Sequence, residues 1–519
     1  MKRVATLMVS VLIVAMMSFV ATAASQDNSA TSRVVSAVRA YRVAHEPQII
    51  SEFVSLLSIP NVASDTPNIQ RNATALVAML NHRGFHTQLL PIPGRGPVVF
   101  GDLDSPSAKG TVIFYCHYDG QPVNAGNWTG TKPFVPALRT DTIDAGGQLI
   151  PFPDQPGAYK DGWRLYARSA ADDKAPIIAL LAAVDALRAN HIPLAVNLKI
   201  VLEGEEEDSS PHLAATVAAH KNLFAGDLLI AADGPVDQSG RPLISFGNRG
   251  VISVRITVFG PLHPLHSGHY GNWAPNPAMS LAKLLATMKD PDGHVLIAGF
   301  YDNVVPLGPA ERKAIAEAPD NDAKLLRTFG LAEPHGGGKK LLELLNEPSL
   351  NIDGLQSGWT GAQAKTIIPD TASASLDMRL VKNAGPEQEF DRLVAHIRKQ
   401  GFYVIDREPT SDERAKYPRI AEVTHDSGYP ATRTPMDLPI SQALMRVVDA
   451  SAGQLAVKIP LVGGSVPMYI FNDMGLPVIG VPIVNFDDNQ HSANENLRIG
   501  NLWTGMEIYA NILANLEWK

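Results

Sequence analysis

The pattern of apolar and polar positions predicts an α/β fold in which a buried strand ends in chemically capable residues. Residues 111–116 are apolar and rich in β-branched and aromatic side chains, which is typical of a strand inside a helix-flanked sheet. His117 and Asp119 follow, and their spacing of two puts both side chains on the same side of the chain. Ligands bind at the carboxyl ends of strands in open α/β sheets. The pair therefore suits a metal ligand beside a carboxylate that orients it.

Helical and strand patterns alternate along the first half of the chain. Helices are predicted at 47–57, 71–83 and 174–189, the last with Pro176 in its first turn. The predicted strands are 88–90, 98–103, 111–116, 197–202 and 228–232. This order predicts a mostly parallel sheet flanked by helices.

Near Gly247 the pattern changes to one that alternates polar and apolar positions, as half-exposed antiparallel strands do. The elements expected after that point are strands 251–258, 372–380 and 402–406 and helices 276–289 and 386–400. Their order predicts a ferredoxin-like α+β domain, inserted at residues 247–410.

The inserted domain divides the rest into two parts, residues 24–246 and 411–519, which together form the helix-flanked α/β domain. Buried α/β patterning resumes in the second part, with a helix at 440–452 and a strand at 478–484. A length of 519 residues also favours more than one domain.

Residues 1–23 have the pattern of a cleavable signal peptide. Lys2 and Arg3 precede an apolar stretch, and Ala21-Thr22-Ala23 resembles a cleavage site. A membrane anchor is the alternative, but the apolar stretch is short for a bilayer span. We therefore expect a secreted or periplasmic protein with no membrane association after cleavage.

Composition limits the possible functions. With 45% hydrophobic and 18% charged residues, the chain is typical of a globular protein, and its net charge of −8 argues against nucleic acid as a partner. Cys116 is the only cysteine, so the chain cannot form an internal disulfide. Its place in an apolar strand favours a buried side chain over a reactive thiol.

Acidic residues and histidines recur beside predicted strands and helix starts. The clusters are His117 with Asp119, Asp172 with Asp173, Glu203 with 205–208, Asp233, and 487–491. Gathered at one sheet edge, so many carboxylates would repel one another without a cation. Two histidines with several carboxylates match zinc or a similar divalent ion, and one carboxylate can bridge two ions.

Each cluster also has an interpretation without metal. Asp172 and Asp173 could cap a helix, 205–208 could be a solvated acidic loop, and Asp233 could belong to a turn. His491 could be an ordinary surface histidine. These interpretations are weaker together, because each must separately explain a position next to a strand.

When these clusters are taken together with further motifs, the chain resembles the carnosinase-type dinuclear zinc metallopeptidases. Relatives of that family include aminoacylases, glutamate carboxypeptidases and succinyl-diaminopimelate desuccinylase. The matching stretches are 117–122, 168–174, 203–207, Asp233, 248–250, 265–268, 299–302, 463–467 and 491–495. They follow the family order and span nearly all of the chain after residue 23.

The resemblance implies two divalent metal ions, with zinc expected first and manganese or cobalt as alternatives. It assigns one ion to His117, Asp172 and Asp233 and the other to Asp172, Glu207 and His491, so that Asp172 bridges. It also implies a cis peptide between Asp172 and Asp173.

Catalytic roles follow from the same resemblance. Glu206 would be the general base that deprotonates the water between the metals, and Asp119 would hydrogen-bond His117. His266 would stabilise the oxyanion, reaching the site of the other subunit of a homodimer through the inserted domain, which would be the lid and dimerisation domain. His263 and His269 are nearby, but only His266 has the Leu-His-Ser-Gly context.

Arg379, Gly464 and Ser465 resemble positions that bind a substrate carboxylate. Arg379 could instead be a strand residue paired with its neighbours. The chain departs from the carnosinase pattern at Leu461-Val462, where relatives have Arg-Glu, and at Asn272, which replaces glycine.

The sequence as a whole predicts an exported metallopeptidase that hydrolyses dipeptides or short peptides. An amidohydrolase acting on N-acyl amino acids would use the same metal site and is the first alternative. A catalytically silent binding protein on the same fold is the second, and it is disfavoured because every expected ligand and the base are present.

Overall fold

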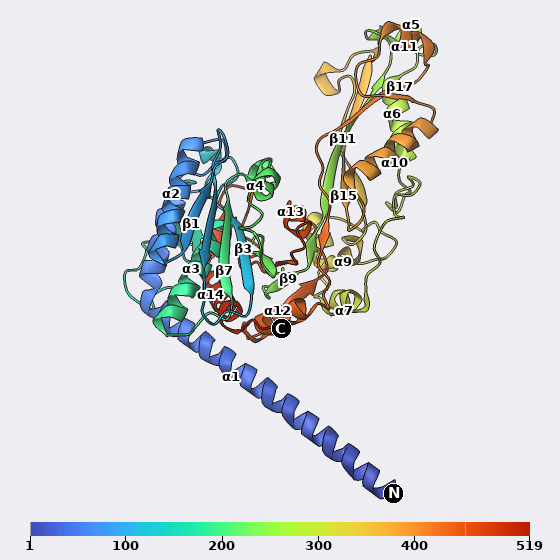
Figure 1. The fold of residues 1–519 in the computed structure, drawn as a ribbon. Helices are drawn as coiled ribbons and strands as arrows, with labels where there is room; N and C mark the ends of the chain where they lie inside the picture. Colours follow the sequence, from blue (N-terminus) through green and yellow to red (C-terminus); the bar gives the residue numbers. More distant parts are fainter. Residues whose placement is uncertain (1, 452) are drawn as a thin grey trace. The chain divides into compact units, whose positions relative to one another are not determined.

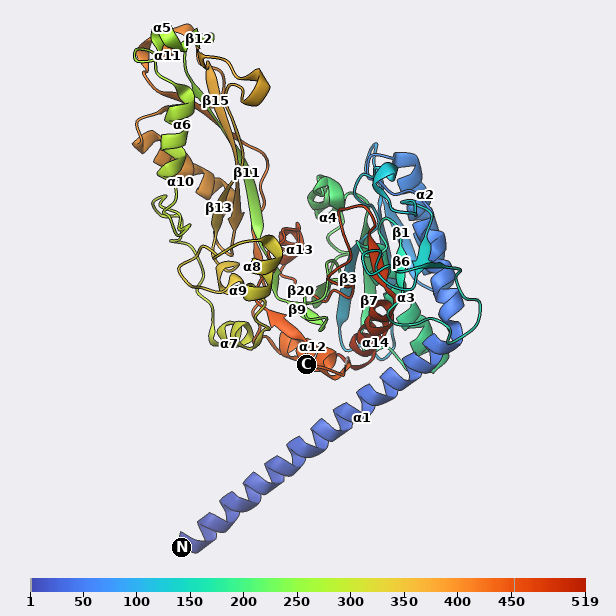
Figure 2. The same ribbon diagram turned by 180° about the vertical axis from the view of Figure 1, so that it is seen from behind.

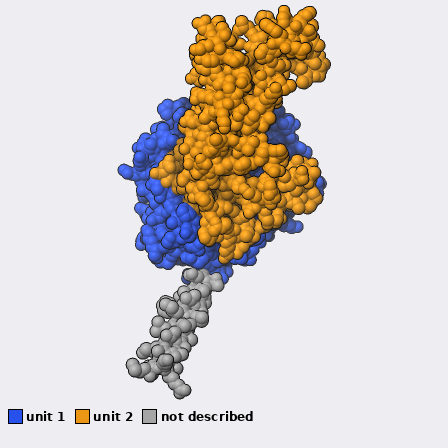
Figure 3. Space-filling model, turned by 90° about the vertical axis from the view of Figure 1, so that its right-hand side faces the viewer, with its two compact units in different colours: residues 1–244, 435–458, 474–519 blue, residues 245–434, 459–473 orange. Residues whose placement is uncertain are grey.

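The computed structural model describes the backbone of residues 2–451 and 453–519, and the side chains from residue 30 onward. The chain divides into two compact units, which Figure 3 distinguishes by colour. Unit 1 comprises residues 1–244, 435–458 and 474–519, and unit 2 comprises residues 245–434 and 459–473. The predicted α/β fold class, with a largely parallel central sheet and a second domain, is confirmed.

An eight-stranded sheet forms the centre of unit 1 (Figure 1). In spatial order its strands are β1 (His86–Leu90), β2 (Val98–Leu103), β7 (Asn197–Glu203), β3 (Thr111–His117), β8 (Leu228–Ala231), β20 (Val478–Gly480), β9 (Leu243–Ser245) and β19 (Val457–Ile459). Strand β3 runs parallel to β7 and β8, and β8 runs parallel to β20. The carboxyl ends of these strands therefore lie at one edge.

The helices of unit 1 bury the apolar faces of this sheet. They are α1 (Lys2–Leu57), α2 (Thr66–His82), α3 (Lys174–Ala189), α4 (Leu213–Ala219), α12 (Pro439–Ser451) and α14 (Ile499–Asn515). Helices α1, α3 and α14 pack against one another, while α2 contacts β1 and β2. Helix α3 is nearly all buried and apolar, as expected of a helix that packs between the sheet and other helices.

A four-stranded sheet is the second sheet of unit 1. Its order is β21 (Asn496–Arg498), β6 (Arg164–Tyr166), β4 (Ala137–Arg139) and β5 (Leu149–Ile150). Pairing of β21 with β6 joins two segments that are far apart in the sequence, with Asn496 opposite Tyr166. No local pattern in the sequence predicted this pairing.

Unit 2 contains a five-stranded sheet with helices packed on it. In spatial order the strands are β13 (Ser349–Gln356), β15 (Thr371–Leu380), β11 (Gly250–Phe259), β17 (Ile420–His425) and β16 (Tyr403–Ile405). Helices α6 (Pro277–Ala286) and α10 (Pro386–Lys399) pack on this sheet, where both contact β11 (Figure 2). Inward-facing side chains such as Ile256 and Leu376 alternate with polar ones, as predicted from the period of two.

The remaining elements of unit 2 are short. They are β10 (Gly247–Asn248), β18 (Thr432–Arg433), β12 (Leu265–His266), β14 (Ile367–Ile368), α5 (Ser267–Tyr270), α7 (Pro309–Glu317), α8 (Asp322–Phe329), α9 (Leu341–Leu344), α11 (Ser411–Lys416) and α13 (Tyr469–Asn472).

The division of the chain differs from the predicted boundaries. Unit 2 continues past residue 410 to Thr434, because β17 is an interior strand that pairs with β11. The predicted strand at 478–484 is also shorter than expected, since β20 ends at Gly480. The first difference comes from pairing between distant segments, which local pattern does not encode.

Candidate metal centre

Three central strands deliver several of the predicted site residues to one edge of the sheet. His117 is the last residue of β3 and is fully buried, and it lies opposite Glu203 at the end of β7. Asp233 follows β8 after one intervening residue. Glu206 and Glu207 begin a short 3-10 helix that follows β7. This convergence is the geometric consequence of parallel strands.

His117 has a carboxylate on each side of its ring. Its Nδ1 lies 3.2 Å from Asp119 Oδ1, and its Nε2 lies 2.8 Å from Asp172 Oδ1. The Asp119 carboxylate also accepts hydrogen bonds from the backbone N–H groups of Glu206 and Glu207, at 3.2 and 3.0 Å. Asp119 thus fixes both the ring of His117 and the acidic turn after β7.

Two groups of side chains in the described structure have the spacing to hold a metal ion. His117, Asp172 and Asp233 form one group, and Asp172, Glu207 and His491 form the other; ligand atoms within each group lie within 4.8 Å of one another. His491 Nε2 lies 3.1 Å from Asp172 Oδ2 and 3.3 Å from Glu207 Oε2. The two oxygens of Asp172 therefore face different histidines, as a bridging carboxylate requires.

The electrostatics of this cluster favour a cation. Burial and the neighbouring carboxylates raise the pKa of Glu207 to about 7 and that of Asp233 to about 6. Burial raises the pKa of Glu206 well above its usual value, and Asp233 and Asp172 add to this. Acidic groups this close resist ionising together unless positive charge lies between them.

The pKa values of the two histidines are also raised, which for a histidine favours the charged form. The hydrogen bond to Asp172 raises the pKa of His491 to about 9. Burial opposes the charged form of His117, but Asp119 and Asp172 outweigh it and raise its pKa well above normal. The two histidines and the carboxylates around them form a nitrogen and oxygen donor set that fits zinc or a related metal.

Residues without an assigned role also support the centre. The Gln121 amide donates to Glu207 Oε2 at 2.7 Å, and Asp173 Oδ2 accepts the backbone N–H of His117 at 3.2 Å. Glu495 accepts hydrogen bonds from the chain around Asp172, whose peptide bond to Asp173 is cis, as the resemblance implied. The sequence signal for Glu495 was its place in the 491–495 motif.

Unit 2 holds the residues predicted to bind substrate. Arg379 Nη1 donates to Ser465 Oγ at 2.8 Å, and its Nε donates to Asp377 at 2.9 Å. The main-chain carbonyl of Gly464 accepts the backbone N–H of Arg249 at 3.2 Å. Arg379 thus contacts Ser465 in the predicted substrate-binding turn and also pairs with Asp377 on its own strand. These contacts are compatible with a role in binding substrate and with a role within the strand.

His266 lies at the N-terminus of α5 and is exposed. Its Nδ1 accepts the backbone N–H of Gly268 at 3.1 Å, which leaves the proton of the neutral ring on Nε2. The ring of His269 packs beside it, with centroids 4.5 Å apart. His266 can therefore donate a hydrogen bond through Nε2.

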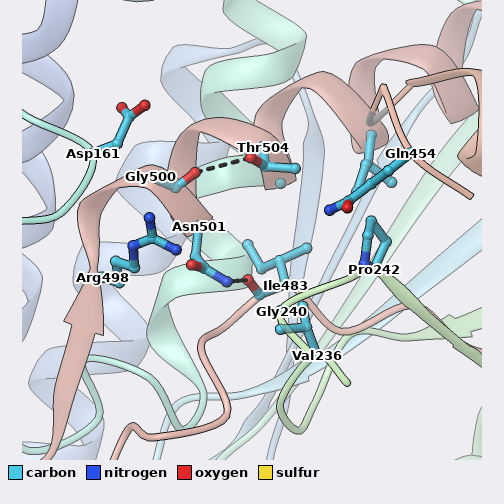
Figure 4. Close-up of a pocket in the computed structure, with 12 residues that line it drawn as sticks. Asp161, Val236, Gly240, Pro242, Gln454, Ile483, Arg498, Gly500, Asn501 and Thr504 are labelled. Atoms are coloured by element: carbon cyan, nitrogen blue, oxygen red, sulfur yellow. Dashed lines mark hydrogen bonds between the residues drawn. The ribbon is translucent and has the colours of Figure 1, made fainter. Parts of the chain in front are cut away.

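A separate hollow in unit 1 contains none of the predicted site residues. It has a volume of about 180 Å³ and lies at the start of α14, beside Asp161 and Arg498 (Figure 4). Asn501 donates to the carbonyl of Ile483 and Thr504 to that of Gly500, at 2.9 and 3.0 Å. These side chains are satisfied by backbone groups, and the hollow has no donor set for a metal.

Comparison with known proteins identifies the family. The model for "Peptidase family M20/M25/M40" matches residues 113–515, which contain every predicted metal ligand. The chain belongs to this family. The match confirms the resemblance predicted from the motifs and identifies the protein as a metallopeptidase.

Several curated relatives of this M20 peptidase are dipeptidases. It is 28% identical over 489 residues to the Cys-Gly metallodipeptidase DUG1 of Candida albicans, covering 90% of this chain and 94% of the relative. It is also 28% identical over 436 residues to the human Beta-Ala-His dipeptidase, covering 82% and 77%. The solved M20 metallo-carboxypeptidase Sso-CP2 from Sulfolobus solfataricus is 28% identical, with a TM-score of 0.73 over 90% of this chain and 98% of that one.

These relationships support a metallodipeptidase with a metal-binding cluster. The expectation of a secreted or periplasmic protein was wrong, because the yeast Cys-Gly metallodipeptidases among the relatives are cytosolic or intracellular. The predicted signal peptide, residues 1–23, lies outside the residues whose side chains are described. Among the described residues, none of the helices has the length and apolar character needed to cross a membrane.

Proposed function

We propose that this M20 peptidase hydrolyses dipeptides or short peptides at a pair of divalent cations, zinc in the first instance, with Glu206 as general base. The observation that carries the proposal is the pair of ligand groups that share Asp172. The dipeptidase relatives support the substrate class. Bound cations would polarise the scissile carbonyl and lower the pKa of the attacking water.

The chain's own residues would supply the proton transfers. Glu206 is in neither ligand group, and its Oε2 lies 4.0 Å from His117 Nε2, so its carboxylate is free to act beside the cations. It would take a proton from the attacking water and deliver it to the leaving amine. Asp119 would hold this turn in place through the backbone N–H of Glu206.

The substrate's own carboxylate would bind in unit 2. Arg379 offers a planar donor fork next to Ser465, and a Cβ added at Gly464 would meet nothing within 4 Å, so there is room for backbone contact there. Recognition of this kind would favour a free C-terminal carboxylate, which dipeptides and N-acyl amino acids both have. The enzyme can therefore tell the two classes apart only at the other end of the substrate, where a dipeptide has a free amine and an N-acyl amino acid does not.

A substrate panel tests this proposal. We expect the metal-loaded chain to hydrolyse Cys-Gly or β-Ala-His with kcat/KM at least about tenfold above that for N-acetyl amino acids. Amidation of the dipeptide's C-terminus should cost roughly 10- to 100-fold, the effect of losing a charge-assisted hydrogen bond. A chelator should abolish turnover. Preference for N-acetyl amino acids, or turnover that survives chelation, would refute the dipeptidase assignment.

We further propose that the chain acts as a homodimer in which His266 Nε2 donates to the oxyanion of the partner's substrate. Support comes from apolar side chains left exposed around this histidine in unit 2, including Leu262 at 76% and Trp273 at 81%. Aromatic side chains of this kind are common anchors of protein interfaces. The described residues do not otherwise bury this patch.

Sedimentation equilibrium tests the dimer. Wild-type protein should have twice the mass of one chain, and Trp273→Ser should weaken association and lower kcat together. Leu149→Ser, which removes an exposed apolar side chain from unit 1, is the matched control and should stay dimeric. Full activity from a monomeric wild-type protein would contradict the proposal.

A further inference from the structure

Glu495 is a buried carboxylate that has no role in the proposed chemistry yet accepts four hydrogen bonds. Glu495 has no solvent-exposed surface. Oε2 accepts Arg168 Nη1 at 2.7 Å and the backbone N–H of Ser169 at 2.9 Å. Oε1 accepts the backbone N–H groups of Ala171 and Asp172, at 2.9 and 3.0 Å. The carboxylate thus fixes the turn that ends in Asp172.

The charge of Glu495 is balanced within the same turn. Arg168 is its partner, and only 3% of the Arg168 side chain is exposed. Water therefore contributes little to holding either group. Burying an isolated carboxylate at this depth would cost much free energy, and the four donors, with Arg168 among them, offset that cost.

Glu495 also connects the two parts of the chain that carry the ligand residues Asp172 and His491. His491 lies four residues before it, and its Nε2 is 3.1 Å from Asp172 Oδ2. Strand β21 begins directly after Glu495 and pairs with β6. The loop that carries His491 and the turn that carries Asp172 are consequently joined through this one side chain and the short strand pair beside it.

We propose that Glu495 is a positioning residue that holds Asp172 in the orientation needed to bridge two cations. It touches neither substrate nor metal and acts through the backbone of Asp172. This inference rests on the proposed two-cation site. Removal of a group that orients a metal ligand commonly lowers metal affinity by about 10- to 100-fold.

A merely structural role makes a different prediction. If Glu495 only stabilised the fold, its loss would lower the melting temperature of the metal-free protein but leave zinc affinity unchanged in molecules that remain folded. A positioning role changes the zinc affinity itself. Zinc affinity and the melting temperature of the metal-free protein therefore have to be measured on the same preparation.

The decisive variant is Glu495→Gln, which keeps the volume but replaces one accepting oxygen by an amide that faces N–H donors. Asp487→Asn is the matched control. Asp487 lies in the same segment and forms a two-bond pair with Arg164, at 2.8 Å each, but its side chain is 59% exposed and does not contact Asp172. Zinc affinity is measured by competition with a chromogenic chelator, with zinc as the only metal added and no substrate present.

We expect Glu495→Gln to weaken zinc binding about 10- to 100-fold, and Asp487→Asn to change it less than about twofold. Equal zinc affinity in wild type and Glu495→Gln, or an equal loss in the control, would overturn the inference. Wild-type protein that binds no zinc would instead defeat the proposed function.

A second variant covers the case in which Glu495→Gln does not fold. Arg168→Lys keeps a positive charge beside Glu495 but replaces the guanidinium, and it leaves the backbone donors in place. We expect zinc affinity to fall about three- to tenfold, since the carboxylate is held less firmly. Unchanged affinity in this variant would overturn the positioning role.

Discussion

Replacing Glu206 by alanine is expected to lower kcat about 10²- to 10⁴-fold while the protein keeps its full metal content. Glu206 belongs to neither ligand group, so its loss removes a proton acceptor and no metal ligand. Its carboxylate lies at the edge of the cluster, 4.0 Å from His117 Nε2. The measurement is kcat on a dipeptide combined with elemental analysis of the same sample.

Asp208→Asn is the matched control for this prediction. Asp208 lies in the same acidic run but is half-exposed and pairs with Arg95 at 3.0 Å. Its replacement should leave kcat within about twofold, because Asp208 is in neither ligand group and an exposed ion pair adds little to stability. Near-normal activity in Glu206→Ala would remove the base assignment, and loss of metal would make Glu206 a ligand instead.

The second large effect is expected from His491→Ala, which should lose one of two metal equivalents and nearly all activity. His491 belongs only to the group with Asp172 and Glu207, whereas the group with His117 and Asp233 keeps all its members. Elemental analysis after gel filtration should therefore give one metal per chain. A two-metal mechanism cannot proceed with one cation missing.

His86→Ala is a suitable control, because His86 is exposed on β1 and belongs to neither group. It should retain two equivalents and wild-type activity. If His491→Ala still bound two equivalents, the second ligand group would have to be reassigned.

The sequence predicted the central part of the fold because that part is locally encoded. The buried run before His117 became β3, and helix 174–189 coincides with α3. Parallel strands align their carboxyl ends, so strand ends far apart in sequence were expected to meet, and His117 and Asp233 lie in one ligand group. The family motifs then supplied the roles.

The rest depends on contacts that no local pattern encodes. The hydrogen bonds of Glu495 join it to a turn in a distant part of the sequence, and the donors that face its Oε1 are backbone groups, which nearly every residue has. The boundary of unit 2 depends on the pairing of β17 with β11, two strands separated by most of that unit's sequence. The wrong prediction of a secreted or periplasmic location was based only on the signal-peptide pattern of residues 1–23.

The most direct test of the account is a zinc titration of chelator-treated wild-type protein, followed by calorimetry and by dipeptide turnover in the same samples. The ligand groups that share Asp172 predict two zinc ions per chain and turnover that appears only as they bind. Binding of one ion or none, with full activity against dipeptides, would contradict the two-cation centre.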